Sequence, residues 1–309
     1  MTTASASARW LGLDALRGLS IAAMILVNNP GRWGSAWQFG PLRHAAWHGC
    51  TFTDLVFPTF LFCAGVAIVP ALARRLANGD PRAPIVGKIG RRVLALLLLG
   101  MFLSAFPLVT FAAGKELFAP LLGVRFPGVL QRIGVCYGIA ALLLLFTAVR
   151  TQRLVLALCL LGYWPLITLV PIPDIGAPDI DVSGQTLQAW LDQAVFGGHI
   201  YRGWEGDPEG LLSTIPALGT CLLGVEAGRV LASPRSDRDK VRALLLGGIV
   251  AMLLGYAWSF ALPFNKPIWT SSYAVWTAGI ATIVLAALHR TAQTGPGPRL
   301  LRPLQIYGL

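Results

Sequence analysis

One segment near the start of the chain, residues 44–54, combines side chains that together could move a proton. His44 and His48 precede Asp54, and the apolar residues that follow predict a helix over 52–73. Asp54 would then lie in the first turn of that helix, where the helix dipole favours a carboxylate. If the preceding loop folds back, His44 can pair with Asp54, and such a pair fixes the tautomer of a general base. We therefore predict that His44 and Asp54 are catalytic residues.

The same residues allow simpler interpretations, which stay open at this point. Asp54 could serve only as a helix cap, and His44, Trp47 and His48 could lie in the headgroup layer, where such side chains are favoured. His44 and His48 could also bind a metal, but no third ligand follows at a fixed spacing. The five cysteines show no close pairing and most lie in apolar stretches. We therefore expect neither disulfides nor a metal site.

A second group of charged residues lies at the start of apolar stretches. Asp14 and Arg17 are three residues apart and would share one helix face, so they can pair. Together with Arg91 and Arg92, Arg17 could receive the phosphates of a donor that arrives from the cytoplasm. A structural ion pair, and arginines that reach the interface from a helix end, explain these residues without a ligand.

Further polar residues recur where helices are expected to start on one side of the membrane. Together with His48 and with Asp14, Arg17, Arg91 and Arg92 they form the predicted substrate- and donor-binding set: Gln131 and Arg132 after Pro127-Gly128, Glu209 in the 207–210 segment, and Lys266, Trp269 and Ser271 in the 265–272 segment. Each has a local explanation, because Asp207 before Pro208 is typical of a helix N-cap and the 265–272 segment is a plausible cap. Their common level in the membrane predicts one polar site.

The composition decides the fold class that must position these residues. Hydrophobic residues make up 55% of the 309 residues and charged residues only 13%, about half of the share in soluble domains. Apolar stretches approach the roughly 20 residues that cross a bilayer, and in lipid the backbone satisfies its hydrogen bonds within helices. We predict an all-α polytopic transmembrane helix bundle, with about eight full spans plus the start of another. The spans are expected at 12–29, 52–73, 93–113, 128–148, 154–170, 211–229, 243–262 and 270–288.

The distribution of basic residues predicts the orientation of the bundle. Of the 25 Lys and Arg, all but seven fall on one set of alternate loops and helix ends. The seven are Arg32, Arg43, Lys115, Arg125, Arg132, Arg202 and Lys266. This positive-inside pattern predicts a cytoplasmic N-terminus and outward-facing first, third, fifth and seventh loops. Anionic lipid accounts for the net charge of +11, so we expect an integral protein of a bacterial inner (plasma) membrane and no nucleic acid partner.

We expect a single domain over residues 1–309. Its one long connection, residues 171–210, is predicted to face outward, and the stretch from Leu187 to Phe196 to form a short helix over the bundle. The last residues, from Arg302 to Leu309, look like the entry to another span. We therefore expect the natural protein to continue beyond them.

Several of these segments resemble one known family. They are Leu13–Gly18, Asn28–Gly31, His44–Phe62, Arg125–Ile133, Asp207–Thr214 and Asn265–Ser272. In order along nearly the whole chain, they resemble the heparan-alpha-glucosaminide N-acetyltransferase family, in particular its short bacterial members, which lack the luminal domain of the animal enzyme. Members continue past the point where this chain stops, so the resemblance implies that closing spans are missing here.

The resemblance implies a transmembrane acetyltransferase. Acetyl-CoA would come from the cytoplasm as co-substrate, and the acceptor would be the amine of a terminal glucosamine on the far side. The active histidine of the family falls on His44, and the asparagine and aspartate that accompany it fall on Asn28 and Asp54. The resemblance also implies a homodimer.

The implied chemistry is the removal of a proton from an amine that attacks a thioester. An imidazole titrates near neutral pH and can accept that proton, with Asp54 orienting His44 and Asn28 donating to the oxyanion. Whether His44 is a general base or carries the acetyl group itself stays open. The main alternative is an amino-sugar or N-acetylglucosamine transporter, although the sequence shows no repeated half; a membrane scaffold is the third.

Overall fold

The computed structural model describes residues 10–29, 39–111 and 116–308, and within these residues all regular structure is helical. Some residues named in the sequence predictions lie outside the described residues. They are Arg9, Arg32 and Lys115 of the charge pattern, Pro30 and Gly31 of the second motif, the last two residues of the span expected at 93–113, and Leu309. The all-α prediction is confirmed.

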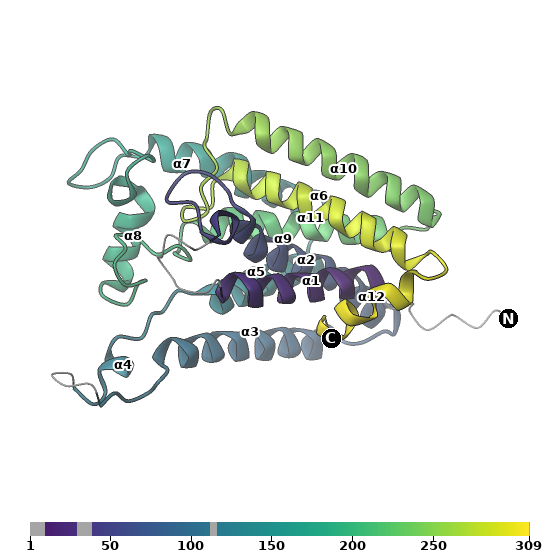
Figure 1. The fold of residues 1–309 in the computed structure, drawn as a ribbon, viewed down its shortest axis with the longest axis horizontal. Helices are drawn as coiled ribbons and strands as arrows, with labels where there is room; N and C mark the ends of the chain where they lie inside the picture. The colour runs from purple at the N-terminus through teal and green to yellow at the C-terminus, as the bar shows by residue number, and fades with distance from the viewer. Residues whose placement is uncertain (1–9, 30–38, 112–115, 309) are drawn as a thin grey trace.

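Among the described residues, the helices of the bundle run along its length, and α6, η2 and α7 follow one another as one rod (Figure 1). The helices of the bundle are α1 (Leu11–Asn28), α2 (Phe52–Ala77), α3 (Arg82–Ala105), α5 (Val129–Phe146), the successive α6 (Val149–Ala157), η2 (Leu158–Gly162) and α7 (Tyr163–Leu169), α9 (Thr214–Ala232), α10 (Asp237–Trp258) and α11 (Ser271–Ala292). The other described elements are η1 (Gly40–Leu42), α4 (Ala119–Leu122), η3 (Ser183–Gln185), α8 (Leu187–Phe196) and α12 (Gly297–Tyr307). α8 occupies the stretch in which a short helix is expected from the sequence.

Among the described residues, seven helices are long and apolar enough to cross a membrane, with α6, η2 and α7 together forming one of them. α3 has 24 residues, but Lys88, Arg91 and Arg92 lie in its first half, so its apolar part is shorter. The integral-membrane prediction is therefore supported, and α3 is the segment on which a count of eight depends.

The boundaries of α3 differ most from the sequence prediction of 93–113. The helix begins at Arg82 because long basic side chains can extend from a helix end toward water, so charge does not stop the helix. It ends at Ala105, since Pro107 follows and the residue before a proline disfavours helical geometry. α10 likewise begins early, at Asp237, because the Ser236 side chain caps its first turn.

The centre of the bundle is the packing of α2 against α9. A Cβ atom at Gly224 would clash with the carbonyl oxygen of Phe62, and one at Gly65 would clash with that of Cys221. Small residues at such contacts let helix backbones approach closely, as is common in membranes. This packing fixes the first turn of α2, where Asp54 lies, relative to the loop that precedes α9.

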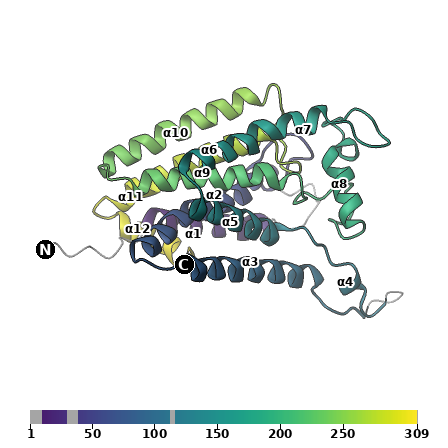
Figure 2. The same cartoon turned by 180° about the vertical axis from the view of Figure 1, so that it is seen from behind.

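The connections alternate between the two ends of the bundle (Figure 2). One end, here called the α8 end, carries the described connecting residues 39–51, 106–111, 116–128, 170–213 and 259–270. These are the connections that the charge pattern predicts to face outward. The opposite end carries the short connections 78–81, 147–148, 233–236 and 293–296, together with α12.

Candidate active site

His44 and Asp54 are paired at the α8 end. The Nδ1 atom of His44 lies 2.6 Å from Oδ1 of Asp54. The other carboxylate oxygen, Oδ2, accepts hydrogen bonds from the backbone N–H groups of Ala45 at 3.1 Å and Thr51 at 3.0 Å. Helix capping and pairing with histidine are therefore not alternatives, because Asp54 does both.

The two members of this couple differ in exposure. The side chain of Asp54 is 1% exposed, whereas that of His44 is 49% exposed. Nδ1 of His44 faces the carboxylate, and its Nε2 atom has no hydrogen-bond partner among the residues described. A ring held at one nitrogen and open at the other has the geometry of a general base.

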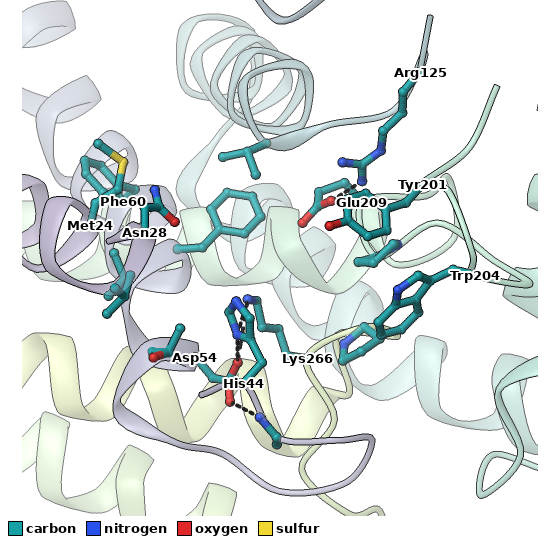
Figure 3. A pocket seen from close by; sticks show the side chains of 18 residues that line it. Met24, Asn28, His44, Asp54, Phe60, Arg125, Tyr201, Trp204, Glu209 and Lys266 are labelled. Atoms are coloured by element: carbon teal, nitrogen blue, oxygen red, sulfur yellow. Dashed lines mark hydrogen bonds and ion pairs between the residues drawn. The ribbon is translucent and has the colours of Figure 1, made fainter. Parts of the chain in front are cut away.

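The couple lies in the wall of a cavity of about 390 Å³, within the range of roughly 300–1,000 Å³ that is usual for small-molecule sites. Figure 3 shows Met24, Asn28 and Phe60 along one side of it and the aromatic rings of Tyr201 and Trp204 toward the other. Asn28 is the last residue of α1, so the cavity joins the end of that helix to the long connection before α9. Its lining is mostly apolar with a few polar groups.

A buried ion cluster forms the far wall of the cavity (Figure 3). Nε of Arg125 donates to Oδ2 of Asp207 at 2.7 Å, and the same guanidinium also pairs with Glu209. The Asp207 side chain is 0% exposed and also accepts the backbone N–H of Tyr201 at 2.8 Å. Burial disfavours the Arg125 cation, but the two carboxylates outweigh it and raise the pKa of Arg125.

The interpretation of Asp207 as an N-cap is wrong. α9 begins at Thr214, after the residue Ser213, and Asp207 binds Arg125, which lies 82 residues earlier in the chain. Helix-start chemistry is readable locally, whereas an ionic partner from another connection is not. Glu209, predicted as a binding residue, lines the cavity beside this pair.

Lys266 reaches the couple from the connection before α11. Its Nζ atom lies 3.1 Å from Nδ1 of His44 and 3.6 Å from Oδ1 of Asp54. Burial lowers the pKa of Lys266, and the Asp54 carboxylate opposes that change. The site thus contains an imidazole, a carboxylate and an amine within contact of one another.

Four other residues of the predicted binding set lie behind the cavity. The guanidinium of Arg132 lies 5.2 Å from the centre of the Trp269 ring and donates to the carbonyl of Gly210 at 3.1 Å. Trp269 is 0% exposed, and the hydroxyl of Ser271 donates to a backbone carbonyl of η2. Gln131 is buried against α3. These contacts show that each residue packs within the protein. Their roles as substrate or donor contacts stay predictions.

His48 joins the long connection to the site from outside the cavity. Its Nε2 lies 2.8 Å from Oδ1 of Asp181 and its Nδ1 lies 3.3 Å from the side-chain amide of Asn265. The indole N–H of Trp47 donates to the carbonyl of Ile180 at 2.8 Å. The two histidines thus bind different carboxylates, and the described part of the chain holds no group of three or more His, Cys, Asp or Glu that could bind a metal.

The predicted phosphate-binding arginines lie toward the opposite end. Arg17 pairs with Asp14 at 3.7 Å on α1, which packs on α2, α11 and α12. Arg92 lies over the ring of Tyr137, 4.8 Å from its centre, where α3 packs on α5. Arg91 is exposed on the same helix. A joint role of these arginines at a donor stays a prediction.

Four residues that line or support the cavity are not among the site residues predicted from the sequence. They are Arg125, Asp207, Tyr201 and Trp204. One signal for the ion cluster was available in the sequence. Arg125 lies shortly before α5, and the acidic residues Asp207 and Glu209 flank Pro208. These opposite charges lie in connections that are predicted to share one side of the membrane. The aromatic residues in the long connection have no comparable signal.

Comparison with known proteins gives a consistent result. Residues 9–197 match the family described as heparan-alpha-glucosaminide N-acetyltransferase, catalytic. The human heparan-alpha-glucosaminide N-acetyltransferase is 28% identical over 333 residues, covering 91% of this chain and 48% of the relative, and the mouse protein is 28% identical over 346 residues, covering 93% and 50%. The chain thus spans about half the length of the curated relatives it matches. Asn28, His44 and Asp54 fall within the matched residues 9–197, and Glu209 and Lys266 follow them.

Proposed function

The chain belongs to the heparan-alpha-glucosaminide N-acetyltransferase family, and on this premise we propose that it transfers an acetyl group from acetyl-CoA to the amine of a glucosamine-type sugar. The protein is an integral membrane protein. In the proposed reaction the acceptor enters from the α8 end and the donor thioester reaches the same cavity from the opposite face of the membrane. The bacterial inner membrane, the sidedness and a homodimer belong to this proposal.

The observation that carries the proposal is the His44–Asp54 couple in the wall of the cavity. A sugar amine must lose a proton as it attacks a thioester carbonyl. Nε2 of His44 accepts that proton, while Asp54 holds the ring through Nδ1. The new C–N bond forms, the C–S bond breaks, and the thiolate of coenzyme A leaves and takes up a proton. Asn28, which lines the same cavity, donates to the oxyanion of the tetrahedral intermediate.

The remaining cavity lining suits a sugar ring. The rings of Tyr201 and Trp204 offer flat apolar faces, and the Glu209 carboxylate offers an acceptor for sugar hydroxyl groups. Aromatic faces combined with a few placed polar groups are typical of sites that bind a polar ligand with an apolar face. A cycle in which His44 carries the acetyl group would use the same residues and differ in its kinetics.

The direct test is acetylation of a panel of amino sugars by purified protein with labelled acetyl-CoA. His44→Ala should lower the rate by about 100-fold or more, the usual contribution of a general base. His289→Ala is the matched control, since His289 lies beside Asp237 in the last turn of α11, at the opposite end of the bundle from the cavity, and it should retain most of the activity. Full activity of a folded His44→Ala variant would reject the assignment, and flux of unmodified sugar into vesicles without acetyl-CoA would favour a transporter.

A further inference from the structure

The connection between α10 and α11 is held by its own polar side chains. The Asn265 side chain accepts the backbone N–H of Ile268 at 3.0 Å, and the Thr270 hydroxyl accepts the backbone N–H of Asn265 at 3.0 Å. The hydroxyl of Ser272 donates to the carbonyl of Leu262 at 2.6 Å. Asn265, Thr270 and Ser272 are all 0% exposed. These side chains serve the conformation of the connection itself.

Neighbouring elements fix the same connection from outside. The phenol of Tyr163 in α7 donates to the carbonyl of Ile268 at 2.6 Å, and the side-chain amide of Gln188 in α8 donates to that of Pro267 at 3.1 Å. Within this rigid connection, Lys266 extends toward another part of the site, where its amine contacts His44 and Asp54. The connection thus holds a largely buried amine against the His44–Asp54 couple.

The charges around His44 decide whether its ring can accept a proton. A buried carboxylate 2.6 Å from Nδ1 would, by itself, stabilise the imidazolium form, and an imidazolium cannot act as a base. The Lys266 ammonium lies 3.1 Å from the same nitrogen and 3.6 Å from the same carboxylate. It neutralises the charge of Asp54 and repels a second positive charge on the ring.

We propose that Lys266 is a positioning residue that keeps the His44 imidazole uncharged, and so ready to accept a proton, by neutralising Asp54. The inference rests on the proposed function, in which His44 is the base. The other titratable groups that face Lys266 are Glu209 and Cys50. Burial raises the pKa of Cys50 to about 12, so this thiol carries no charge near neutral pH. Glu209 pairs with Arg125, which leaves Asp54 as the carboxylate that Lys266 neutralises.

The first test reads the charge of His44 without any catalysis. Diethyl pyrocarbonate modifies uncharged imidazole, so the modification rate of the peptide that contains His44, followed by mass spectrometry against pH, reports its protonation. In Lys266→Met the midpoint of this profile should move to higher pH by about one unit or more, with about tenfold slower modification on the acid side of the profile. Lys266→Arg, which keeps a cation, should retain the wild-type midpoint. An unchanged midpoint in Lys266→Met would overturn the inference.

The second test uses the reaction itself. In Lys266→Met the acid limb of the pH profile for kcat/KM of acetyl transfer should move in the same direction, while Lys266→Arg retains the wild-type limb. Lys266→Gln, a neutral side chain that still forms hydrogen bonds, replaces the Met variant if that variant does not fold. A shifted modification profile in a protein that transfers no acetyl group would sink the proposed function and leave the electrostatic role of Lys266 intact. If the wild type transfers acetyl groups normally and the pH profile of Lys266→Gln is not shifted, only the proposed role of Lys266 is rejected.

Discussion

The two ends of the bundle carry their charges in different ways. At the α8 end, Arg125 binds Asp207 from a connection 82 residues away, and Lys266 reaches Asp54 from a still more distant one. At the opposite end, the pairs Asp14–Arg17, Asp237–Lys240 and Asp239–Arg242 each lie three residues apart on a single helix. The Arg153–Glu226 pair there does join two helices, but the side chain of Arg153 is 63% exposed.

This difference distinguishes ion pairs between distant segments, which form a site, from ion pairs on the surface of one helix end. Buried ions are costly unless they are paired, so an arrangement that buries several of them around one cavity has to be held by the fold. Exposed pairs on one helix contribute little and need no such support. The α8 end is therefore where specific binding and proton transfer are expected.

The largest expected effect on stability, and so the strongest test of the difference between the two ends, comes from the loss of Arg125. Arg125→Met leaves the buried Asp207 and Glu209 carboxylates without their cation, and we expect a loss of about 3–5 kcal/mol in the free energy of unfolding. Chemical unfolding in detergent, followed by tryptophan fluorescence, measures this loss. Arg153→Met at the opposite end is the matched control and should leave the unfolding midpoint unchanged. Equal losses in the two variants would mean that the ends do not differ.

A smaller effect tests the α8 end through pH. Burial raises the pKa of Asp192 to about 6 from its ordinary value of 3.8, although backbone N–H groups of Leu211 and Asp207 lower it. Between these two values the folded protein holds a proton that the unfolded chain has released. The stability contributed by Asp192 is therefore complete below about pH 4 and is lost as the pH rises through about 6.

Wild type should accordingly lose stability relative to Asp192→Asn by on the order of 3 kcal/mol between about pH 4 and pH 7. Unfolding curves of both proteins over this range give the difference. Asp174→Asn, an exposed position in the same connection, should follow the wild type at every pH. Parallel curves for wild type and Asp192→Asn would show that Asp192 does not hold a proton in the folded state.

The comparison also explains how much of the molecule could be predicted from its sequence. Helices follow from the length of apolar stretches, and the short helix α8 begins and ends where its pattern of residues indicates. The His44–Asp54 contact is readable because the two residues lie ten positions apart and a helix start brings them together. Local geometry is enough in these cases.

The rest depends on packing between distant segments. Asp207 has the sequence of a helix cap, and only the placement of two connections at one end turns it into the partner of Arg125. The contact of Lys266 with His44 likewise requires a connection fixed by α7 and α8. The start of α3 was predicted too late because its charged first turns are helical without being apolar.

The smallest expected effect on stability is at the opposite end, where it tests whether a charge there does more than form an ion pair. Arg17 is paired with Asp14 on one helix, and its side chain is 38% exposed, so Arg17→Gln should change the free energy of unfolding by less than about 1 kcal/mol. If Arg17 also meets the phosphates of a donor, the same variant loses a charge-assisted hydrogen bond, and we expect coenzyme A to bind about tenfold more weakly. Calorimetric titration of coenzyme A into wild type, Arg17→Gln and the control Arg238→Gln, an exposed position in the first turn of α10, separates the two roles. Unchanged binding in Arg17→Gln would leave the ion pair as its only role, and the donor would then have to be held elsewhere, with the basic start of α3 as the next candidate.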